Sequence, residues 1–150
     1  MSTMDTPKFS VTATDGSARV GKLSMARHSL ETPTFMPVGT RGSVRTLTSS
    51  DLEDLGADII LGNTYHLMLR PGEELIENHG GLHEFSDWKR LILTDSGGYQ
   101  IFSLGPEVDD EGVTFKSTYD GSLHRLTPQR AVDIQCSLGA DIQMALDVCP

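Results

Sequence analysis

The sequence has few cysteines, few basic residues and no long hydrophobic run. Its two cysteines, Cys136 and Cys149, lack the CxxC spacing of a redox or zinc motif. We therefore expect free thiols in a reducing compartment. The 12 basic residues are outnumbered by 21 acidic ones, which gives a net charge of −9. That balance argues against non-specific binding of nucleic acid or membrane by this segment, because phosphates favour clustered Lys and Arg.

No apolar run approaches the roughly 18 residues of a membrane span, and the N-terminal residues lack the apolar core of a signal peptide. We therefore expect a soluble, cytoplasmic protein. Hydrophobic residues make up 37% of the 150 residues and are spread along the chain, without repeats or low-complexity segments. This composition indicates a globular chain that is long enough for one ordinary domain.

Four apolar segments are predicted as strands, and helical segments are predicted between them. The strands cover residues 35–38, 58–61, 91–94 and 141–146. The helices cover residues 49–55, 72–80 and 128–138; a capping box of Thr48 and Asp51 is predicted to start the first, and Thr127 and Gly139 are predicted to cap and end the third. This alternation predicts parallel β/α units. A closed (β/α)8 barrel needs roughly 250 residues, so the chain is either a small complete α/β sheet or the first half of a TIM barrel. We favour the half barrel, because the fourth strand would carry site residues without a covering helix.

Two antiparallel elements are predicted beside the β/α units. Residues 1–7 are expected to be a leader, and residues 8–32 alternate around a turn at Asp15-Gly16. A hairpin at about residues 112–126 turns at Asp120-Gly121. The prediction is that residues 1–150 are the N-terminal part of a single catalytic barrel domain, in which residues 33–150 form barrel units one to four with the hairpin inserted.

Polar side chains follow three of the predicted strands. Asp95 comes after the third strand and is followed by Ser96, two glycines and Tyr99. A carboxylate at a strand end can act as a base, a nucleophile or a ligand for a polar substrate, or can simply cap the next turn. Ser96 is expected to orient a carboxylate, because DSGG is not a GxSxG nucleophile motif. Gly97 and Gly98 permit close approach of a ligand or only a tight turn. Tyr99 can stack on a flat ring or pack in the core.

The other two strand ends carry Asn63 and Asp147. Asp147 has two acceptor oxygens, which match a donor pair such as N1–H and N2–H₂ of guanine, a metal or a sugar hydroxyl. Asn63 can hold a catalytic acid or satisfy loop backbone groups. His79 and His83 are four residues apart but flank two glycines, so a helical metal site there is not expected.

Several motifs together resemble the tRNA-guanine transglycosylases. The matching strings are TFMPVGT (34–40), NTYHLMLRPG (63–72), GGLH (80–83), LTDSGGYQ (93–100), EGVTFKS (111–117) and LGAD (138–141) with Asp147. They occur in order over nearly the whole chain from about residue 8, and the two longest are highly specific. The resemblance implies a TIM barrel that exchanges guanine at the tRNA wobble position for a 7-deazaguanine in queuosine biosynthesis.

The resemblance also implies roles for individual residues. Asp95 matches the proton acceptor for the incoming base, residues 95–99 match the base pocket with Tyr99 stacked on the ring, and Asp147 matches the acid that binds the guanine edge. Asn63, Gln100 and Cys149 are expected to support this pocket. Cys149 matches a pocket cysteine of bacterial members, which favours 7-aminomethyl-7-deazaguanine as the substrate.

The chain also lacks features of the family. Members are more than twice as long, and the later part carries their nucleophilic aspartate, their zinc site and most of the basic tRNA-binding surface. The resemblance implies Zn²⁺ and a homodimer for the full-length protein, and no cofactor or metal within residues 1–150. We therefore expect this chain alone to be inactive. Two alternatives stay open: a non-catalytic tRNA-binding subunit of the same family, and a TIM-barrel glycosidase that uses Asp95 and Asp147 as its carboxylate pair.

Overall fold

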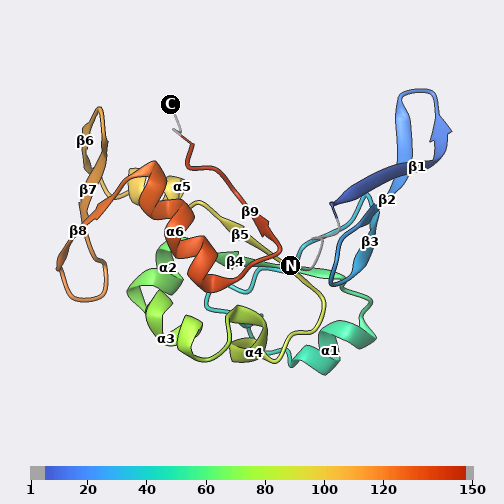
Figure 1. The fold of residues 1–150 in the computed structure, drawn as a ribbon, viewed down its shortest axis with the longest axis horizontal. Helices are drawn as coiled ribbons and strands as arrows, with labels where there is room; N and C mark the ends of the chain where they lie inside the picture. The colour runs from blue at the N-terminus through green and yellow to red at the C-terminus, as the bar shows by residue number, and fades with distance from the viewer. Residues whose placement is uncertain (1–5, 148–150) are drawn as a thin grey trace.

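The centre of the fold is a parallel sheet. A computed structural model describes residues 6–147 and places β4 (Ile59–Asn63), β5 (Leu91–Asp95) and β9 (Ile142–Gln143) in the order β4-β5-β9. Both pairings are parallel. The order in the sheet therefore follows the order in the chain, which confirms the predicted parallel β/α arrangement of a mixed α/β fold (Figure 1).

The first and fourth predicted strands are shorter than expected. The segment 35–38 contributes only one parallel bridge, from Val38 to Leu61. Pro37 accepts a hydrogen bond from the Leu61 N–H at 2.9 Å but has no N–H to extend the ladder. In the fourth segment, β9 ends after two residues, although Met144 N–H still donates to Thr94 O at 3.1 Å. Beyond β9, the side-chain amide of Gln135 binds the Met144 backbone in place of a further strand.

Three helices form where the sequence predicts them: α1 (Ser49–Asp54), α3 (Glu73–Asn78) and α6 (Pro128–Leu138). The predicted capping box of α1 is present, with Thr48 and Asp51 bonded to each other's backbone N–H. Thr127 caps α6, and Gly139 ends it with φ of 70°. Glycine suits that left-handed conformation because it has no Cβ.

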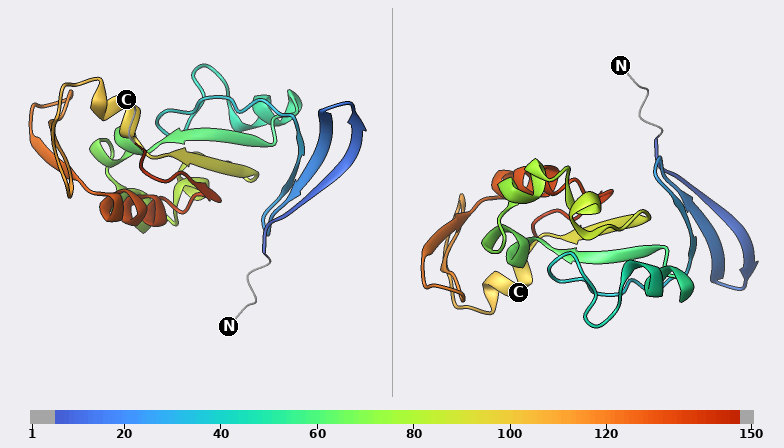
Figure 2. Two further views of the ribbon diagram at one scale, coloured as in Figure 1. Left: turned by 90° about the horizontal axis from the view of Figure 1, so that it is seen from above. Right: turned by 90° about the horizontal axis from the view of Figure 1, so that it is seen from below.

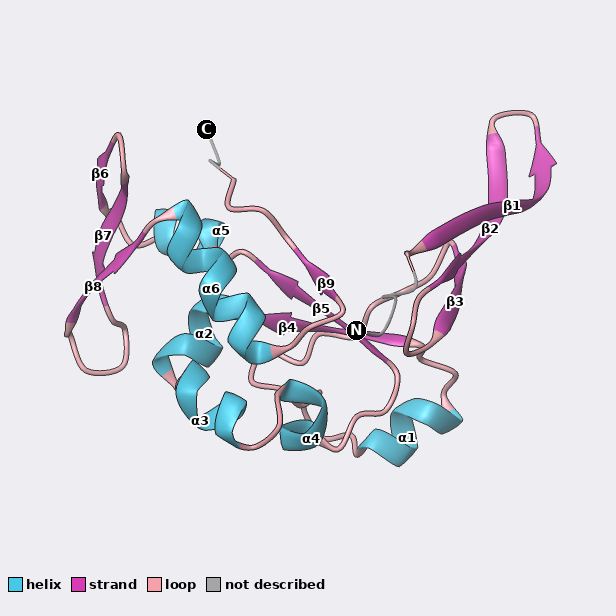
Figure 3. Ribbon diagram, viewed as in Figure 1, coloured by secondary structure: helices cyan, strands magenta, loops and turns pink. Residues whose placement is uncertain are grey.

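Three further helices and two strands are additional to the predictions. The helices α2 (Thr64–Leu69), α4 (Leu82–Ser86) and α5 (Gly98–Phe102) have five or six residues each. The strands are β3 (Ser29–Thr32) and β6 (Glu107–Asp109). Such short elements contain too few residues for a hydrophobic period to be visible. In Figure 3, α2 and α4 lie near α3, whereas α5 lies beyond the C-terminal end of β5, partly behind α6.

Two antiparallel sheets flank the parallel one. The first contains β1 (Lys8–Asp15), β2 (Ala18–Ser24) and β3, and the second contains β6, β7 (Gly112–Lys116) and β8 (Leu123–Leu126). Both predicted hairpins are confirmed, and each gains one unpredicted strand. Figures 1 and 2 show the two sheets at opposite ends of the molecule. The β1–β3 sheet lies beside the N-terminal ends of the parallel strands, and the β6–β8 sheet lies beside their C-terminal ends.

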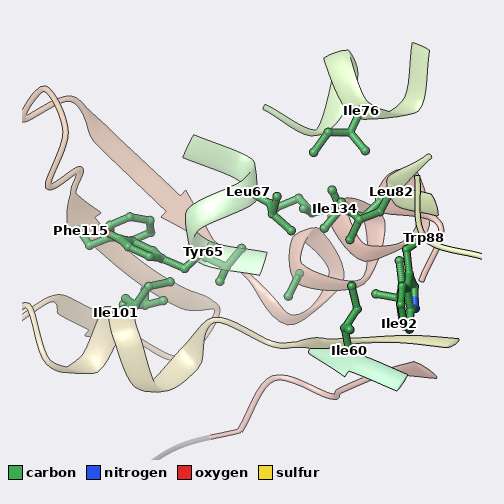
Figure 4. Close-up of a cluster of buried hydrophobic side chains, with 14 of the residues drawn as sticks. Ile60, Tyr65, Leu67, Ile76, Leu82, Trp88, Ile92, Ile101, Phe115 and Ile134 are labelled. Carbon is green, nitrogen blue, oxygen red and sulfur yellow. The ribbon is translucent and has the colours of Figure 1, made fainter. Parts of the chain in front are cut away.

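The core divides between the two faces of the parallel sheet. Ile60 and Ile92 point toward the helices, where Leu67, Leu82 and Ile134 are also buried (Figure 4). Ile59 and Leu91, one position earlier in each strand, face the opposite side of the sheet and pack with Leu30 of β3. This alternation follows from the period of two in a strand. Both faces therefore hold the strands in place, and the C-terminal ends of β4 and β5 are fixed side by side.

Candidate active site

Asn63 and Asp95 lie next to each other at the C-terminal ends of β4 and β5, where they are paired in register. The Asn63 Nδ2 donates to Asp95 Oδ2 at 2.6 Å, and Asn63 Oδ1 accepts the His66 N–H at 3.0 Å as the N-cap of α2. Because a backbone N–H can only donate, the second bond fixes the amide orientation, and its NH₂ group faces the acid. Asn63 therefore caps a helix and holds Asp95 at the same time.

Asp95 is held by neutral donors within the described residues. Its Oδ1 accepts the backbone N–H groups of Thr64 at 3.2 Å and Gly97 at 3.1 Å. Burial raises the pKa of Asp95 above its usual value, the three hydrogen bonds oppose this, and the charge of Asp147 adds to the increase. A carboxylate with a raised pKa and a fixed orientation is suited to accept a proton near neutral pH.

Gly97 and Gly98 allow three segments to meet at this point. Gly97 has φ of +80°, and a Cβ there would lie 3.0 Å from the backbone nitrogen of Tyr65. A Cβ on Gly98 would lie 2.9 Å from the carbonyl oxygen of Asp147. The two glycines are therefore required for the turn after β5 to approach both α2 and the segment that follows β9.

Asp147 lies in that segment and is connected to the same turn. Ser96 Oγ donates to Asp147 Oδ1 at 3.2 Å and accepts the Gly98 N–H at 3.3 Å. The expectation that Ser96 orients a carboxylate agrees with this contact. Asp147 is exposed, and its Oδ2 accepts no hydrogen bond from residues 6–147. The structure thus brings Asn63, Asp95 and Asp147 together, as their shared position after apolar strands predicts.

Asp95 and Asp147 line a pocket with a volume of about 410 Å³, within the range of about 300–1,000 Å³ typical of small-molecule sites. Its wall is formed by Asp95, Ser96, Gly97, Gly98, Tyr99, Gln100, Met144, Ala145 and Asp147. Tyr99 is 69% exposed, so it is not a buried packing residue and its ring is accessible to a ligand. Cys149 lies outside the described residues.

Gln135 is a positioning residue that the sequence analysis missed. It is fully buried on α6, and its Oε1 accepts from Thr94 Oγ1 at 2.9 Å and from Met144 N–H at 3.0 Å. Its Nε2 donates to Met144 O at 3.0 Å. The side-chain amide thus replaces a strand partner and anchors the segment that carries Asp147. The available signal was a polar residue between Ala131 and Leu138 on the apolar face of the helix, where a buried amide requires partners.

His83, one of the two histidines considered for a metal site, has its Nε2 engaged in hydrogen bonds. His83 Nε2 lies 3.1 Å from Arg90 O and 2.9 Å from Asp141 Oδ2, and it donates because a carbonyl oxygen only accepts. Across residues 6–147, no group of three or more His, Cys, Asp and Glu side chains could hold a metal ion. In the same range, no helix is long and apolar enough to cross a membrane.

The geometry suits a flat heterocycle with hydrogen-bond donors on its edge. Asp147 presents free acceptor capacity, Tyr99 presents an aromatic ring, and Asp95 presents a partly desolvated base in the same pocket. Two carboxylates beside one small pocket also fit the acid pair of a glycosidase. The exposed ring and the glycine-lined floor match a planar ligand better than a puckered sugar.

Comparison with known proteins identifies relatives of this chain. Residues 14–150 match a family model described as queuine tRNA-ribosyltransferase. Queuine tRNA-ribosyltransferases from Thioalkalivibrio sulfidiphilus and Thermotoga neapolitana are each 56% identical over 144 residues, which cover 95% of this chain and 39% of each relative. The protein of that name from Nitratidesulfovibrio vulgaris is 56% identical over 149 residues, which cover 97% of this chain and 40% of the relative. The chain therefore spans about two fifths of the length of the curated relatives it matches.

Proposed function

The chain belongs to the queuine tRNA-ribosyltransferase family, and from this premise we propose that the full-length protein exchanges guanine in tRNA for a 7-deazaguanine. The observation that carries the proposal is the pocket formed by Asp95, Tyr99 and Asp147. It combines a buried base, an accessible aromatic ring and an acceptor for a donor pair. These are the groups needed to bind a guanine-like base and to move one proton.

Each pocket residue has a role in the proposal. Asp147 accepts hydrogen bonds from N1–H and N2–H₂ of the base, because two donors on one edge match two carboxylate oxygens. Ser96 fixes the Asp147 carboxylate through their 3.2 Å hydrogen bond. Tyr99 stacks on the ring face. Asn63 holds Asp95, and Gln100 and Cys149 complete the supporting set.

Asp95 acts as the proton acceptor in the exchange. The glycosidic bond from ribose C1′ to the outgoing guanine breaks, and a bond from C1′ to N9 of the incoming base forms. The incoming base loses its N9 proton and the outgoing guanine gains one, so the exchange is balanced. The proposed path takes the proton of the incoming base to Asp95, whose raised pKa favours this step.

The remaining parts of the proposal concern the full-length protein. The nucleophile that holds C1′, a Zn²⁺ site and the main basic tRNA-binding surface are proposed to lie outside this chain, and the assembled enzyme is proposed to be a homodimeric TIM barrel. The consecutive parallel order of the sheet supports a barrel segment. The proposed target is the wobble guanine, and the proposed substrate is 7-aminomethyl-7-deazaguanine, as in bacterial queuosine biosynthesis.

The test is a base-exchange assay on the full-length protein. The protein is incubated with tRNA and labelled guanine, and label in the tRNA is measured, followed by displacement with unlabelled 7-aminomethyl-7-deazaguanine. We expect incorporation, and loss of the label on addition of the deazaguanine. In Asp147→Ala the KM for guanine should rise because two donors lose their acceptor. No incorporation by a folded parent protein would contradict the proposal.

Two other functions are separated by the same experiment. A non-catalytic tRNA-binding subunit would bind tRNA without exchange until a second subunit is added. A glycosidase would hydrolyse a sugar substrate, with both Asp95 and Asp147 required and guanine irrelevant. The complete pocket supports base exchange over the non-catalytic subunit, which needs no such set of residues, and the two acceptor oxygens of Asp147 match a guanine edge.

A further inference from the structure

A cluster of cationic and aromatic side chains lies outside the pocket, at the same end of the sheet. It consists of Arg41, His66, Arg70 and Tyr119, and is called the Tyr119 cluster below. Arg41 follows the segment that bridges to β4, Arg70 is the C-cap residue of α2, and Tyr119 lies in the turn between β7 and β8. Residues from three separate parts of the chain therefore meet at one point.

Tyr119 holds both arginines. The Arg41 guanidinium carbon lies 5.3 Å from the centre of the Tyr119 ring, and that of Arg70 lies 5.0 Å from it. Arg41 Nη2 also donates to the Tyr119 hydroxyl at 3.0 Å. A guanidinium within about 6 Å of an aromatic face is attracted to it and restricted in orientation. The ring therefore gathers two positive charges around one side chain, an arrangement that a bound anion would stabilise.

His66 contributes a hydrogen bond and no third charge. Its Nδ1 lies 3.1 Å from the Tyr119 hydroxyl, which already accepts a hydrogen bond from Arg41. Burial lowers the pKa of His66, and the charge of Arg41 lowers it further. The neutral ring accepts a hydrogen bond from the Tyr119 hydroxyl at Nδ1, so the hydroxyl donates to His66 and accepts from Arg41.

Neither arginine of the cluster is neutralised within the described chain. Five other cations form ion pairs with Asp or Glu, namely Arg27, Lys89, Arg90, Arg125 and Arg130. Arg41 and Arg70 are exposed and have no such partner among residues 6–147. In a chain with a net charge of −9, two oriented guanidiniums that contact the same ring and have no acidic partner among residues 6–147 form a local anion-binding surface.

The cluster is connected to the pocket through α2. His66 N–H binds Asn63 Oδ1, and Asn63 Nδ2 binds Asp95. Arg70 is seven residues after Asn63, or about 10 Å along a helix. We propose that the Tyr119 cluster binds a backbone phosphate of the RNA next to the exchanged nucleotide. This inference rests on the proposed function, and it assigns to this acidic chain one specific phosphate contact that the pocket residues do not supply.

The test measures RNA binding by the full-length protein, without reference to turnover. Affinity for a fluorescent RNA stem-loop that contains the target guanine is measured by anisotropy at several salt concentrations. Arg41→Gln and Arg70→Gln should each weaken binding about tenfold, and should reduce the slope of log affinity against log salt by about 1. Arg41→Lys should retain most of the slope because it keeps the charge. Arg45→Gln, an exposed arginine in the loop that follows Arg41, is the matched control and should leave the slope unchanged.

The outcomes separate this inference from the proposed function. An unchanged salt slope in Arg41→Gln and Arg70→Gln would overturn the phosphate site and leave the cluster with a role only in holding the hairpin. Tight binding of inorganic phosphate that is lost in Arg41→Gln would assign a free-anion site instead of an RNA contact. If the parent protein binds the stem-loop with the expected slope changes but exchanges no base, the phosphate site stands and the proposed function fails. If instead the protein exchanges the base but the salt slopes of Arg41→Gln and Arg70→Gln equal that of the parent, the phosphate site fails and the proposed function stands. An unchanged KM for guanine in both variants then shows that the pocket is intact.

Discussion

The two ends of the parallel sheet each hold a partly buried aspartate, and the two are treated in opposite ways. At the C-terminal end, the Asp95 carboxylate accepts hydrogen bonds, among residues 6–147, only from an amide and two backbone N–H groups. At the N-terminal end, Asp141 accepts from His83 at 2.9 Å, from Arg27 at 3.2 Å and from the Ile92 N–H at 2.8 Å. Burial would raise the pKa of either acid. Hydrogen bonds from His83 and from the Ile92 N–H, together with the charge of Arg27, reverse this for Asp141, whose pKa is lowered, whereas the pKa of Asp95 is raised.

The difference shows how one residue type serves structure at one end and chemistry at the other. Asp141 ties β9 to β5, to α4 through His83, and to the β2–β3 turn through Arg27. A carboxylate that accepts hydrogen bonds from three donors, one of them an arginine, is stabilised in its ionised form and cannot easily take up a proton. The neutral donors around Asp95 fix the orientation of its carboxylate without pairing it with a positive charge, so Asp95 remains able to accept a proton. The predictions below test this division.

The largest expected effect is on turnover. Asp95→Asn in the full-length protein should lower the exchange rate by about 10²-fold or more, because the proton acceptor is lost. The substitution also places an NH₂ group opposite the Asn63 NH₂. The double variant Asn63→Asp, Asp95→Asn restores that hydrogen bond with the acid on the other strand. It should recover thermal stability but not activity, and recovery of both would show that Asp95 is only structural.

The next effect is on stability. Asp141→Ala should lower the free energy of unfolding by about 2–3 kcal/mol, because the Ile92 N–H and the Arg27 guanidinium lose a buried acceptor. Urea unfolding of the parent and the variant measures the difference. Glu53→Ala, an exposed position on α1, is the control and should change stability by less than about 0.5 kcal/mol. A comparable loss in both variants would remove the structural role assigned to Asp141.

A smaller effect is expected at the pocket wall. Tyr99→Ala should weaken base binding by roughly 1–3 kcal/mol, because a stacked ring is lost. Tyr99→Phe keeps the ring face and should be mild. The measurement is the KM for guanine in the exchange assay, with thermal melts to show that the fold is retained. If the Phe variant is as impaired as the Ala variant, the hydroxyl matters and stacking is not the explanation.

Sequence patterns predicted the elements that local chemistry specifies. The capping box at Thr48, the Thr127 cap with Gly139, and both antiparallel hairpins are present where expected. The meeting of Asn63 and Asp95 followed from a general rule, that parallel strands end at one edge of a sheet.

The features that were not predicted depend on tertiary contacts. The sequence assigned no role to Gln135, although it replaces a strand partner for the segment after β9. Likewise, the opposite pKa shifts of Asp95 and Asp141 could not be predicted from sequence alone, because most of the hydrogen-bond partners of these acids come from distant segments. Arg27, for example, lies 114 residues from Asp141. Local patterns therefore locate the acids, and only the fold determines which of them stays available for chemistry.

The last prediction separates the two acids along the pH axis. Because the pKa of Asp141 is lowered in the fold, its contribution to stability is present above the unfolded value of about 3.9 and is lost only as the pH falls through the lower folded value. Because the pKa of Asp95 is raised, its carboxylate is protonated at a higher pH, and the base needed for exchange is lost there first. On acidification, kcat/KM for exchange should therefore fall while the stability difference between the parent and Asp141→Ala is still complete. Activity profiles and urea midpoints between pH 4 and 8 measure both quantities. If the two quantities fall together at the same pH, the acids are not tuned in opposite directions, and the contrast between the two ends of the sheet is wrong.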